Sequence, residues 1–133
     1  MKKQHLIIIL LVSIALMTAC GGSVTPTATK TNETSLSDPK GSIAYQLELV
    51  KAGDADKLRA CFTDRVKDKV TKEAVEKAKT NAAKYTLDDL FASAEMGNSD
   101  GKKTAKIKMK NGRTLTTLIE TNGKWLADTV WID

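Results

Sequence analysis

The chain has 133 residues, with 21 lysines and arginines against 16 aspartates and glutamates and a single histidine. This length suits one small domain. The net charge is only +5 and the chain has only 2 Trp, 2 Tyr and 2 Phe, so the sequence does not show the dense basic surface with interleaved aromatic residues that is typical of nucleic-acid binding. We therefore expect one domain and no nucleic-acid partner.

The first 19 residues have the pattern of a secretory signal peptide. Lys2 and Lys3 precede an almost wholly aliphatic stretch at residues 6–17, and the small residues Thr18 and Ala19 follow it. The stretch is shorter than the roughly 20 apolar residues of a membrane-spanning helix. Removal of residues 1–19 would lower the net charge to +3 and would remove His5, the one histidine.

The cleavage position carries a second signal. Residues 16–21 read Leu-Met-Thr-Ala-Cys-Gly and resemble the lipobox of bacterial lipoproteins, although Met17 stands where leucine is usual. The resemblance implies that Cys20 is acylated and anchors the chain in the lipid bilayer. Gly21 after Cys20, in place of Asp, implies the outer membrane, facing the periplasm or the cell surface. The alternative is an ordinary secreted protein with a cysteine near its cleavage site.

Residues 20–37 are expected to form the lipidated cysteine and a flexible tether. The segment is rich in Thr, Ser and Gly and has no hydrophobic periodicity. A flexible chain of this length reaches about 25 Å, enough to lift a small domain off the lipid headgroups. The folded domain is expected at residues 38–133.

The domain is expected to begin with helices. Asp38 and Pro39 are suited to the N-cap and the first helical position, and Gly53 is suited to end that helix. The core stripe of the first helix is Ile43, Leu47 and Val50.

Two further helical segments are expected. Asp54 is placed to cap a short helix that presents Leu58, Cys61 and Phe62 on one face. A third helical stretch at residues 65–85 is broken near Thr71, which caps its second half. Its inward residues are Val66, Val70, Ala74, Val75 and Ala78.

From residue 87 the period changes to two, which predicts an antiparallel sheet of about four strands. Asn111-Gly112 and Asn122-Gly123 are two-residue hairpin signals, and they divide strands at residues 103–110, 113–121 and 124–132. A weaker strand is expected around residues 90–96, joined by a turn at 97–101. The fold class is therefore α+β, with N-terminal helices packed on a curved antiparallel sheet.

Two-residue turns fix the register and sort the side chains onto two faces. One face is expected to hold Ile107, Met109, Thr114, Thr116, Leu118, Glu120, Trp125, Ala127, Thr129 and Trp131. The other is expected to hold Lys106, Lys108, Lys110, Arg113, Leu115, Thr117, Ile119, Leu126, Asp128, Val130 and Ile132. Because both faces carry apolar residues, we expect a homodimer that buries Leu115, Ile119 and Val130, or else the Trp face.

Two segments resemble the nuclear transport factor two-like, or cystatin-like cone, superfamily. Residues 52–64 resemble its A-G-D-x-x-x-L-x-x-x-F segment between the first two helices, and residues 123–126 with Asp128 resemble the closing G-K-W strand of its small secreted members. The latter include lipoproteins of a domain-of-unknown-function family. The resemblance implies a cone-shaped fold. It carries over no activity, because no catalytic motif of the superfamily is matched here.

Few residues offer catalytic or metal chemistry. Cys61 is either a nucleophile or, as its helical spacing favours, a core residue. The adjacent Asp88 and Asp89 are interpreted as a turn or helix cap, and Glu120, opposite Trp125, is the one candidate general base. Without a histidine in the mature chain, we expect no metal, no cofactor and no catalytic residue.

Two candidate binding surfaces remain. Trp125, Trp131, Met109 and Ile107 would form a ligand or partner face, unless they pack as core. Lys106, Lys108, Lys110 and Arg113 would form a basic patch for anionic lipid or an acidic partner, unless they are a solvated strand.

The function predicted from these features is a membrane-anchored envelope module that binds a small apolar ligand or an envelope protein without catalysis. The alternatives are a carboxylate-based hydrolase or isomerase of the cone fold, or an inhibitor or immunity lipoprotein.

Overall fold

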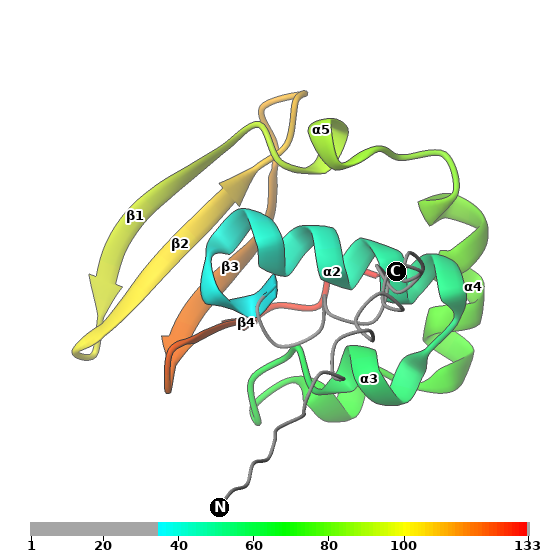
Figure 1. The fold of residues 1–133 in the computed structure, drawn as a ribbon, viewed down its shortest axis with the longest axis horizontal. Helices are drawn as coiled ribbons and strands as arrows, with labels where there is room; N and C mark the ends of the chain where they lie inside the picture. The colour runs from blue at the N-terminus through cyan, green and yellow to red at the C-terminus, as the bar shows by residue number, and fades with distance from the viewer. Residues whose placement is uncertain (1–34, 133) are drawn as a thin grey trace, which may run out of the picture. The chain divides into compact units, whose positions relative to one another are not determined.

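The computed structural model describes residues 35–132, so the predicted signal peptide, Cys20 and most of the tether lie outside the described residues. The described chain is α+β: a set of helices precedes a four-stranded antiparallel sheet with the order β1-β2-β3-β4 (Figure 1). Within residues 35–132, no helix is both long and apolar enough to cross a membrane. The helical elements are η2 (Ser35–Ser37), α2 (Pro39–Ala52), α3 (Ala55–Arg59), η3 (Lys67–Lys69), α4 (Lys72–Ala82) and α5 (Leu87–Leu90). The strands are β1 (Ser93–Ser99), β2 (Lys102–Lys108), β3 (Thr114–Thr121) and β4 (Lys124–Ala127).

The first helix has the caps that its sequence predicts. The Asp38 carboxylate accepts a hydrogen bond from the Gly41 N–H at 2.9 Å, and Pro39 occupies the first turn. Gly53 ends the helix in the left-handed conformation, with a φ of 77°. The stripe of Ile43, Leu47 and Val50 is buried. Order begins slightly earlier than expected, because Leu36 in η2 is already part of the core.

The next two helical segments are also confirmed, with shorter helices than expected. Asp54 caps α3, which ends at Arg59, so Cys61 and Phe62 are buried just beyond it. The predicted break near Thr71 separates η3 from α4, and the Thr71 hydroxyl caps α4 by accepting from the Ala74 N–H at 3.1 Å. The predicted inward residues are buried except Ala74, which is half-exposed.

The strand expected around residues 90–96 was placed too early. Residues 87–90 form α5, because Thr86 and Asp89 make a reciprocal capping box that stabilises a helical turn. The strand β1 instead runs through Gly97 to Ser99. Its turn to β2 is Asp100-Gly101, with φ values of 51° and 77°, a two-residue hairpin that the predicted turn at 97–101 did not resolve.

The two Asn-Gly turns differ from each other. Asn122-Gly123 forms the expected two-residue turn, with Thr121 opposite Lys124. At Asn111-Gly112 the loop is longer: the Met109 N–H donates to the Arg113 carbonyl at 2.8 Å, and the Gly112 N–H donates to the Met109 carbonyl at 2.9 Å. This is a three-residue loop whose last residue, Gly112, is left-handed with a φ of 84°.

The longer loop shifts the register by one residue near the turn. Lys108 pairs with Thr114 and Ile107 pairs with Thr116, so Leu115 is an extra, bulged residue. Beyond the bulge, the predicted register of β2 and β3 is correct. The faces assigned to Thr114 and Leu115 were wrong: the Lys108 ammonium donates to the Thr114 hydroxyl at 3.1 Å, while Leu115 packs against the core.

The last strand is shorter than predicted, since β4 ends at Ala127 and not at residue 132. Beyond Ala127, a side-chain contact takes the place of the backbone hydrogen bonds between β4 and β3: the Thr129 hydroxyl lies 2.8 Å from that of the buried Thr116. Residues 128–132 then leave the sheet and run toward the helices (Figure 1). Ile132, expected on the second face, is consequently buried in the core.

The edge of β4 is covered by the segment after α3. The Thr63 N–H donates to the Ala127 carbonyl, and the Ala127 N–H donates to the Cys61 carbonyl, both at 2.9 Å. The Asp128 carboxylate then accepts hydrogen bonds from Thr63 and Arg65. Burial alone would raise the pKa of Asp128, but these two donors hold it below its usual value.

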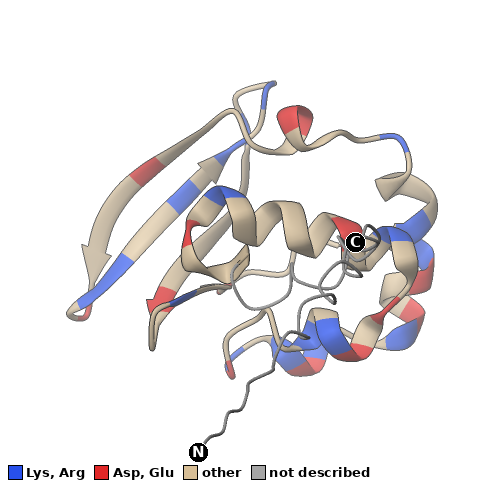
Figure 2. Cartoon of the chain, viewed as in Figure 1, with Lys and Arg blue, Asp and Glu red and all other residues tan. Residues whose placement is uncertain are grey.

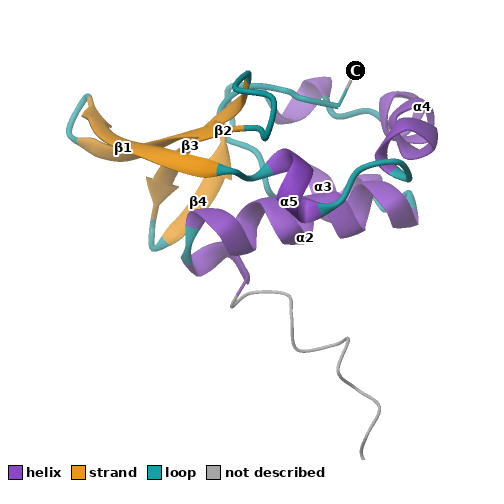
Figure 3. Ribbon diagram, turned by 90° about the horizontal axis from the view of Figure 1, so that it is seen from above, coloured by secondary structure: helices purple, strands orange, loops and turns teal. Residues whose placement is uncertain are grey.

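The helices pack on one face of the sheet, and the hairpin of β1 and β2 projects past them (Figures 1 and 3). Met96 on that hairpin is 60% exposed. The sheet residues that the helices bury are Ala105, Ile107, Leu118, Trp125 and Ala127.

A short chain of hydrogen bonds links the helical layer to the end of the chain. The Trp131 indole N–H donates to the Gln46 side-chain oxygen at 2.8 Å, and the Gln46 amide nitrogen donates to the Ser42 hydroxyl at 3.0 Å. The Ser42 hydroxyl donates to the Trp125 carbonyl at 2.7 Å. Ser42 and Gln46 are fully buried, so these bonds are made in a desolvated site.

Replacing Gln46 with Leu keeps the volume but leaves the Trp131 indole N–H without its acceptor. We expect a loss of about 1–3 kcal/mol in the free energy of unfolding, measured by urea denaturation followed by tryptophan emission. Glu48→Leu, on the exposed side of the same helix, is the control. Equal stability of Gln46→Leu and the wild type would show that this network does not hold the fold.

Candidate functional site

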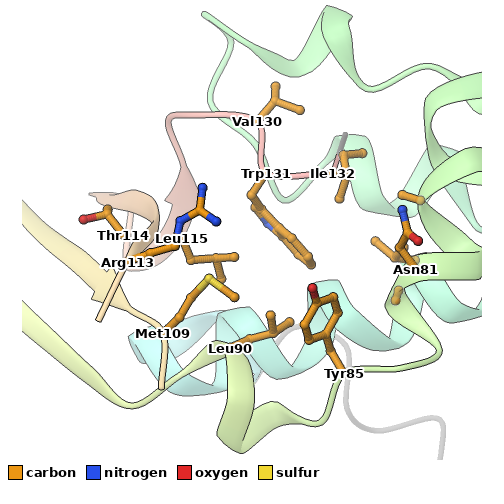
Figure 4. Close-up of a pocket in the computed structure, with 13 residues that line it drawn as sticks. Asn81, Tyr85, Leu90, Met109, Arg113, Thr114, Leu115, Val130, Trp131 and Ile132 are labelled. Atoms are coloured by element: carbon orange, nitrogen blue, oxygen red, sulfur yellow. The ribbon is translucent and has the colours of Figure 1, made fainter. Parts of the chain in front are cut away.

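The principal cavity lies between the helices and the bulged end of the sheet. It has a volume of about 550 Å³ and opens between α4, α5, the loop after β2 and residues 130–132 (Figure 4). The lining residues are Val50, Ala78, Asn81, Ala82, Tyr85, Leu90, Met109, Arg113, Thr114, Leu115, Val130, Trp131 and Ile132.

Most of the lining residues are apolar, but the surface that they leave accessible in the hollow is more polar than apolar. Val50, Leu90 and Ile132 are buried core residues that expose almost no surface to it. Leu115 and Trp131 are only half-buried, so they present apolar surface to the hollow. Covering this apolar surface with an apolar ligand is favourable, because the surface is removed from water.

Trp131 has a fixed orientation within the pocket. Its indole nitrogen is held by the hydrogen bond to Gln46, and its ring lies in the hollow (Figure 4). The Tyr85 side chain rises from the opposite wall with its hydroxyl toward the indole (Figure 4), and it is 42% exposed. The two aromatic rings therefore narrow the hollow from opposite sides.

The polar groups of the pocket lie at its rim. Asn81 on α4 and Tyr85 beyond that helix supply an amide and a hydroxyl, and Arg113 on the sheet side supplies a guanidinium beside Leu115 (Figure 4). Arg113 is the one ionised side chain among the lining residues. The hollow therefore combines apolar side chains with polar groups at its rim, and small-molecule sites combine the same two kinds of group.

The four residues predicted as a ligand face divide between the pocket and the core. Trp131 and Met109 line the pocket. Trp125, 6% exposed, and Ile107, fully buried, pack inside the domain and have no access to the hollow. The sequence analysis did not identify Tyr85, Leu90 and Leu115 as pocket residues. A three-residue loop at Asn111-Gly112, had it been predicted, would have turned Leu115 toward the pocket.

The predicted basic patch is divided as well. Lys106 and Lys108 lie on the sheet face away from the helices. Glu95 is beside both of them: it is opposite Lys106 in the register of β1 and β2, and its carboxylate is 4.0 Å from the Lys108 ammonium. Lys110 lies in the loop, and Arg113 lies at the pocket rim. Charges of both signs also alternate over α3 and α4 (Figure 2).

The expected dimer surface is divided in the same way. Leu115 and Val130 line the pocket, whereas Ile119 lines a separate hollow on the other sheet face together with Leu126. The three residues therefore do not form one contiguous apolar patch.

Two of the carboxylates singled out by the sequence, Glu120 and Asp89, have structural partners. Glu120 lies opposite Trp125, as expected, and its carboxylate is 3.4 Å from the Lys103 ammonium. Asp89 accepts hydrogen bonds from the backbone and hydroxyl of Thr86, which lower its pKa and confirm its interpretation as a cap. Neither carboxylate lines the cavity.

Cys61 is the free cysteine of the described region. Its side chain is fully buried, and its sulfur donates to the Lys57 carbonyl at 3.5 Å. Burial raises the pKa of the Cys61 thiol to about 12. Within residues 35–132, no three His, Cys, Asp or Glu side chains converge as ligands for a metal ion.

Comparison with known proteins adds no relative: no family model, curated protein or solved structure matches the chain significantly.

The buried thiol predicts slow alkylation. Because the pKa of Cys61 is raised to about 12, its thiolate is scarce in the folded protein at pH 7–9, whereas in unfolded chains a cysteine with an ordinary pKa ionises as the pH rises through about 8.5. We expect iodoacetamide to label Cys61 slowly in buffer and rapidly in urea, measured by peptide mass spectrometry. Labelling at equal rates in both conditions would contradict a core role.

Proposed function

We propose that the chain is a membrane-tethered, non-catalytic binding module of the bacterial cell envelope that holds a small apolar ligand in the pocket beside Trp131. The observation that carries the proposal is the half-buried Trp131, held by Gln46, in the wall of a hollow of about 550 Å³. Its volume lies within the range of roughly 300–1,000 Å³ that is usual for small-molecule sites.

The construction of the pocket supports binding over catalysis. Its lining supplies apolar surface and no carboxylate, thiol or imidazole. The general-base candidate from the sequence, Glu120, lies 3.4 Å from the Lys103 ammonium and does not line the cavity. The rigid placement of Trp131 by Gln46 also favours a preformed site, because less side-chain freedom is lost on binding.

The proposed tether rests on the sequence at residues 16–21. Acylation of Cys20 by two or three long chains would hold the chain on a membrane, because each buried methylene contributes about 0.8 kcal/mol. The absence of Asp after Cys20 supports the outer membrane, facing the periplasm or the cell surface. The pocket would then lie within reach of that membrane.

We further propose that the domain is a divergent member of the nuclear transport factor two-like superfamily. The positions of the two motifs in the fold support this proposal. Residues 52–54 lie at the junction of α2 and α3, Gly123 ends the turn before β4, and Lys124 begins β4.

Lipidation is tested by changing Cys20 to Ser. We expect the variant to remain unprocessed and to lose labelling by a palmitate analogue, while the Cys61→Ala variant is processed and labelled like the wild type. Gel mobility and acyl labelling in a bacterial host provide the measurement. Undiminished labelling of Cys20→Ser would remove the tether from the proposal.

Ligand binding is tested on the full chain in lipid nanodiscs, with 1-octanol as an apolar probe. Since Trp131 lines the pocket and Trp125 lies in the core, we expect octanol to shift the indole N–H signal of Trp131 and to leave that of Trp125 in place. Val130→Phe fills part of the hollow and should weaken binding about tenfold, whereas Ile119→Phe on the other sheet face should not. Unshifted Trp131, or unimpaired binding by Val130→Phe, would contradict a ligand site here.

A further inference from the structure

Arg113 gives the pocket a chemical preference. Resting on the proposed ligand site, we propose that the pocket selects an apolar chain with one anionic head group, such as a medium-chain carboxylate, and that Arg113 binds the head group.

The backbone of Arg113 is held firmly at the pocket rim. Its carbonyl accepts from the Met109 N–H at 2.8 Å, and its N–H donates to the Asn111 side-chain oxygen at 3.0 Å. These bonds belong to the three-residue loop whose bulge also turns Leu115 inward. One local feature therefore places an apolar wall and a guanidinium next to each other.

The guanidinium of Arg113 has no ionic partner within residues 35–132. Arg65 shows the contrasting arrangement, because its guanidinium binds both the carboxylate and the carbonyl of Asp128. A guanidinium prefers planar bidentate contact with a carboxylate or phosphate. Arg113 retains that capacity.

The surroundings of Arg113 leave its charge uncompensated. No acidic residue lines the pocket. Asp89 lies in the adjoining hollow and keeps its negative charge, because its hydrogen bonds at 2.9 and 2.7 Å come from the neutral Thr86. Lys84 and Lys110 line the same hollow and outnumber Asp89, so the potential beside the mouth is positive and favours the approach of an anion.

The two halves of the pocket therefore match the two halves of an amphiphile. Leu115, Val130 and Trp131 supply half-buried apolar side chains, and the exposed Arg113 lies at the rim. A neutral head group can hydrogen-bond with Asn81 or Tyr85. An anionic head group adds a charge-assisted hydrogen bond to Arg113, which is stronger than a neutral one.

The test compares two ligands of equal chain length on the full chain in nanodiscs. We expect octanoate to bind at least about tenfold more tightly than 1-octanol at pH 7.5 and low salt, read from the Trp131 indole signal. Arg113→Gln should lower the affinity for octanoate about tenfold and so abolish the preference for octanoate over octanol. Lys106→Gln on the opposite sheet face should keep the preference.

Further arms separate the possible failures. Nanodiscs without protein correct for partition into lipid, and an unchanged Trp125 signal reports that Arg113→Gln is folded. Octyl phosphate that binds like octanoate and depends on Arg113 would extend the same anion chemistry to phosphate head groups. Equal affinity for octanol and octanoate, or an anion preference that survives in Arg113→Gln, would overturn this inference while leaving the ligand site intact. Failure of both ligands to shift Trp131 would instead remove the site itself.

Discussion

The side-chain amide of Gln46 is fully buried among apolar residues, and a buried amide must be satisfied at both ends. Its oxygen accepts from the Trp131 indole and its nitrogen donates to Ser42, which in turn donates to the carbonyl of Trp125. These bonds hold residues 128–132 across the helical layer and away from the line of β4. The same departure from the sheet forms one wall of the pocket, so the core and the candidate site depend on one polar contact.

The elements that sequence reasoning predicted correctly are those fixed by local chemistry. Asp38, Gly53 and Thr71 act within one helical turn, and Asn122-Gly123 requires only its own positive φ values. The errors arise where distant contacts decide. The strand predicted to continue to residue 132 ends at Ala127, because Thr129 and Trp131 find partners on β3 and α2 that no short pattern encodes.

Two of the four residues predicted as a ligand face line the pocket, for an indirect reason. Strand alternation places Trp125 and Ile107 on the helix-covered face, and that coverage removes them from solvent. Trp131 and Met109 reach the pocket because both lie outside the regular strands. Residues in irregular backbone thus line the candidate site. The spacing of hydrophobic residues in the sequence predicts regular helices and strands, and it does not predict where irregular segments lie. The bulge at Leu115 shows the same limit, since one extra loop residue reversed the face of its side chain.

The two edges of the sheet are treated differently. Residues 61–63 cover β4, while the outer edge of β1 pairs with no strand in the described region. An uncovered edge invites pairing between copies, but β1 reads Ser-Ala-Glu-Met-Gly-Asn-Ser, with no β-branched residue, a glycine and a charge. Such a strand is a poor template for fibril growth. The outer edge of β1 is therefore protected by its own composition, whereas the edge of β4 is protected by residues 61–63.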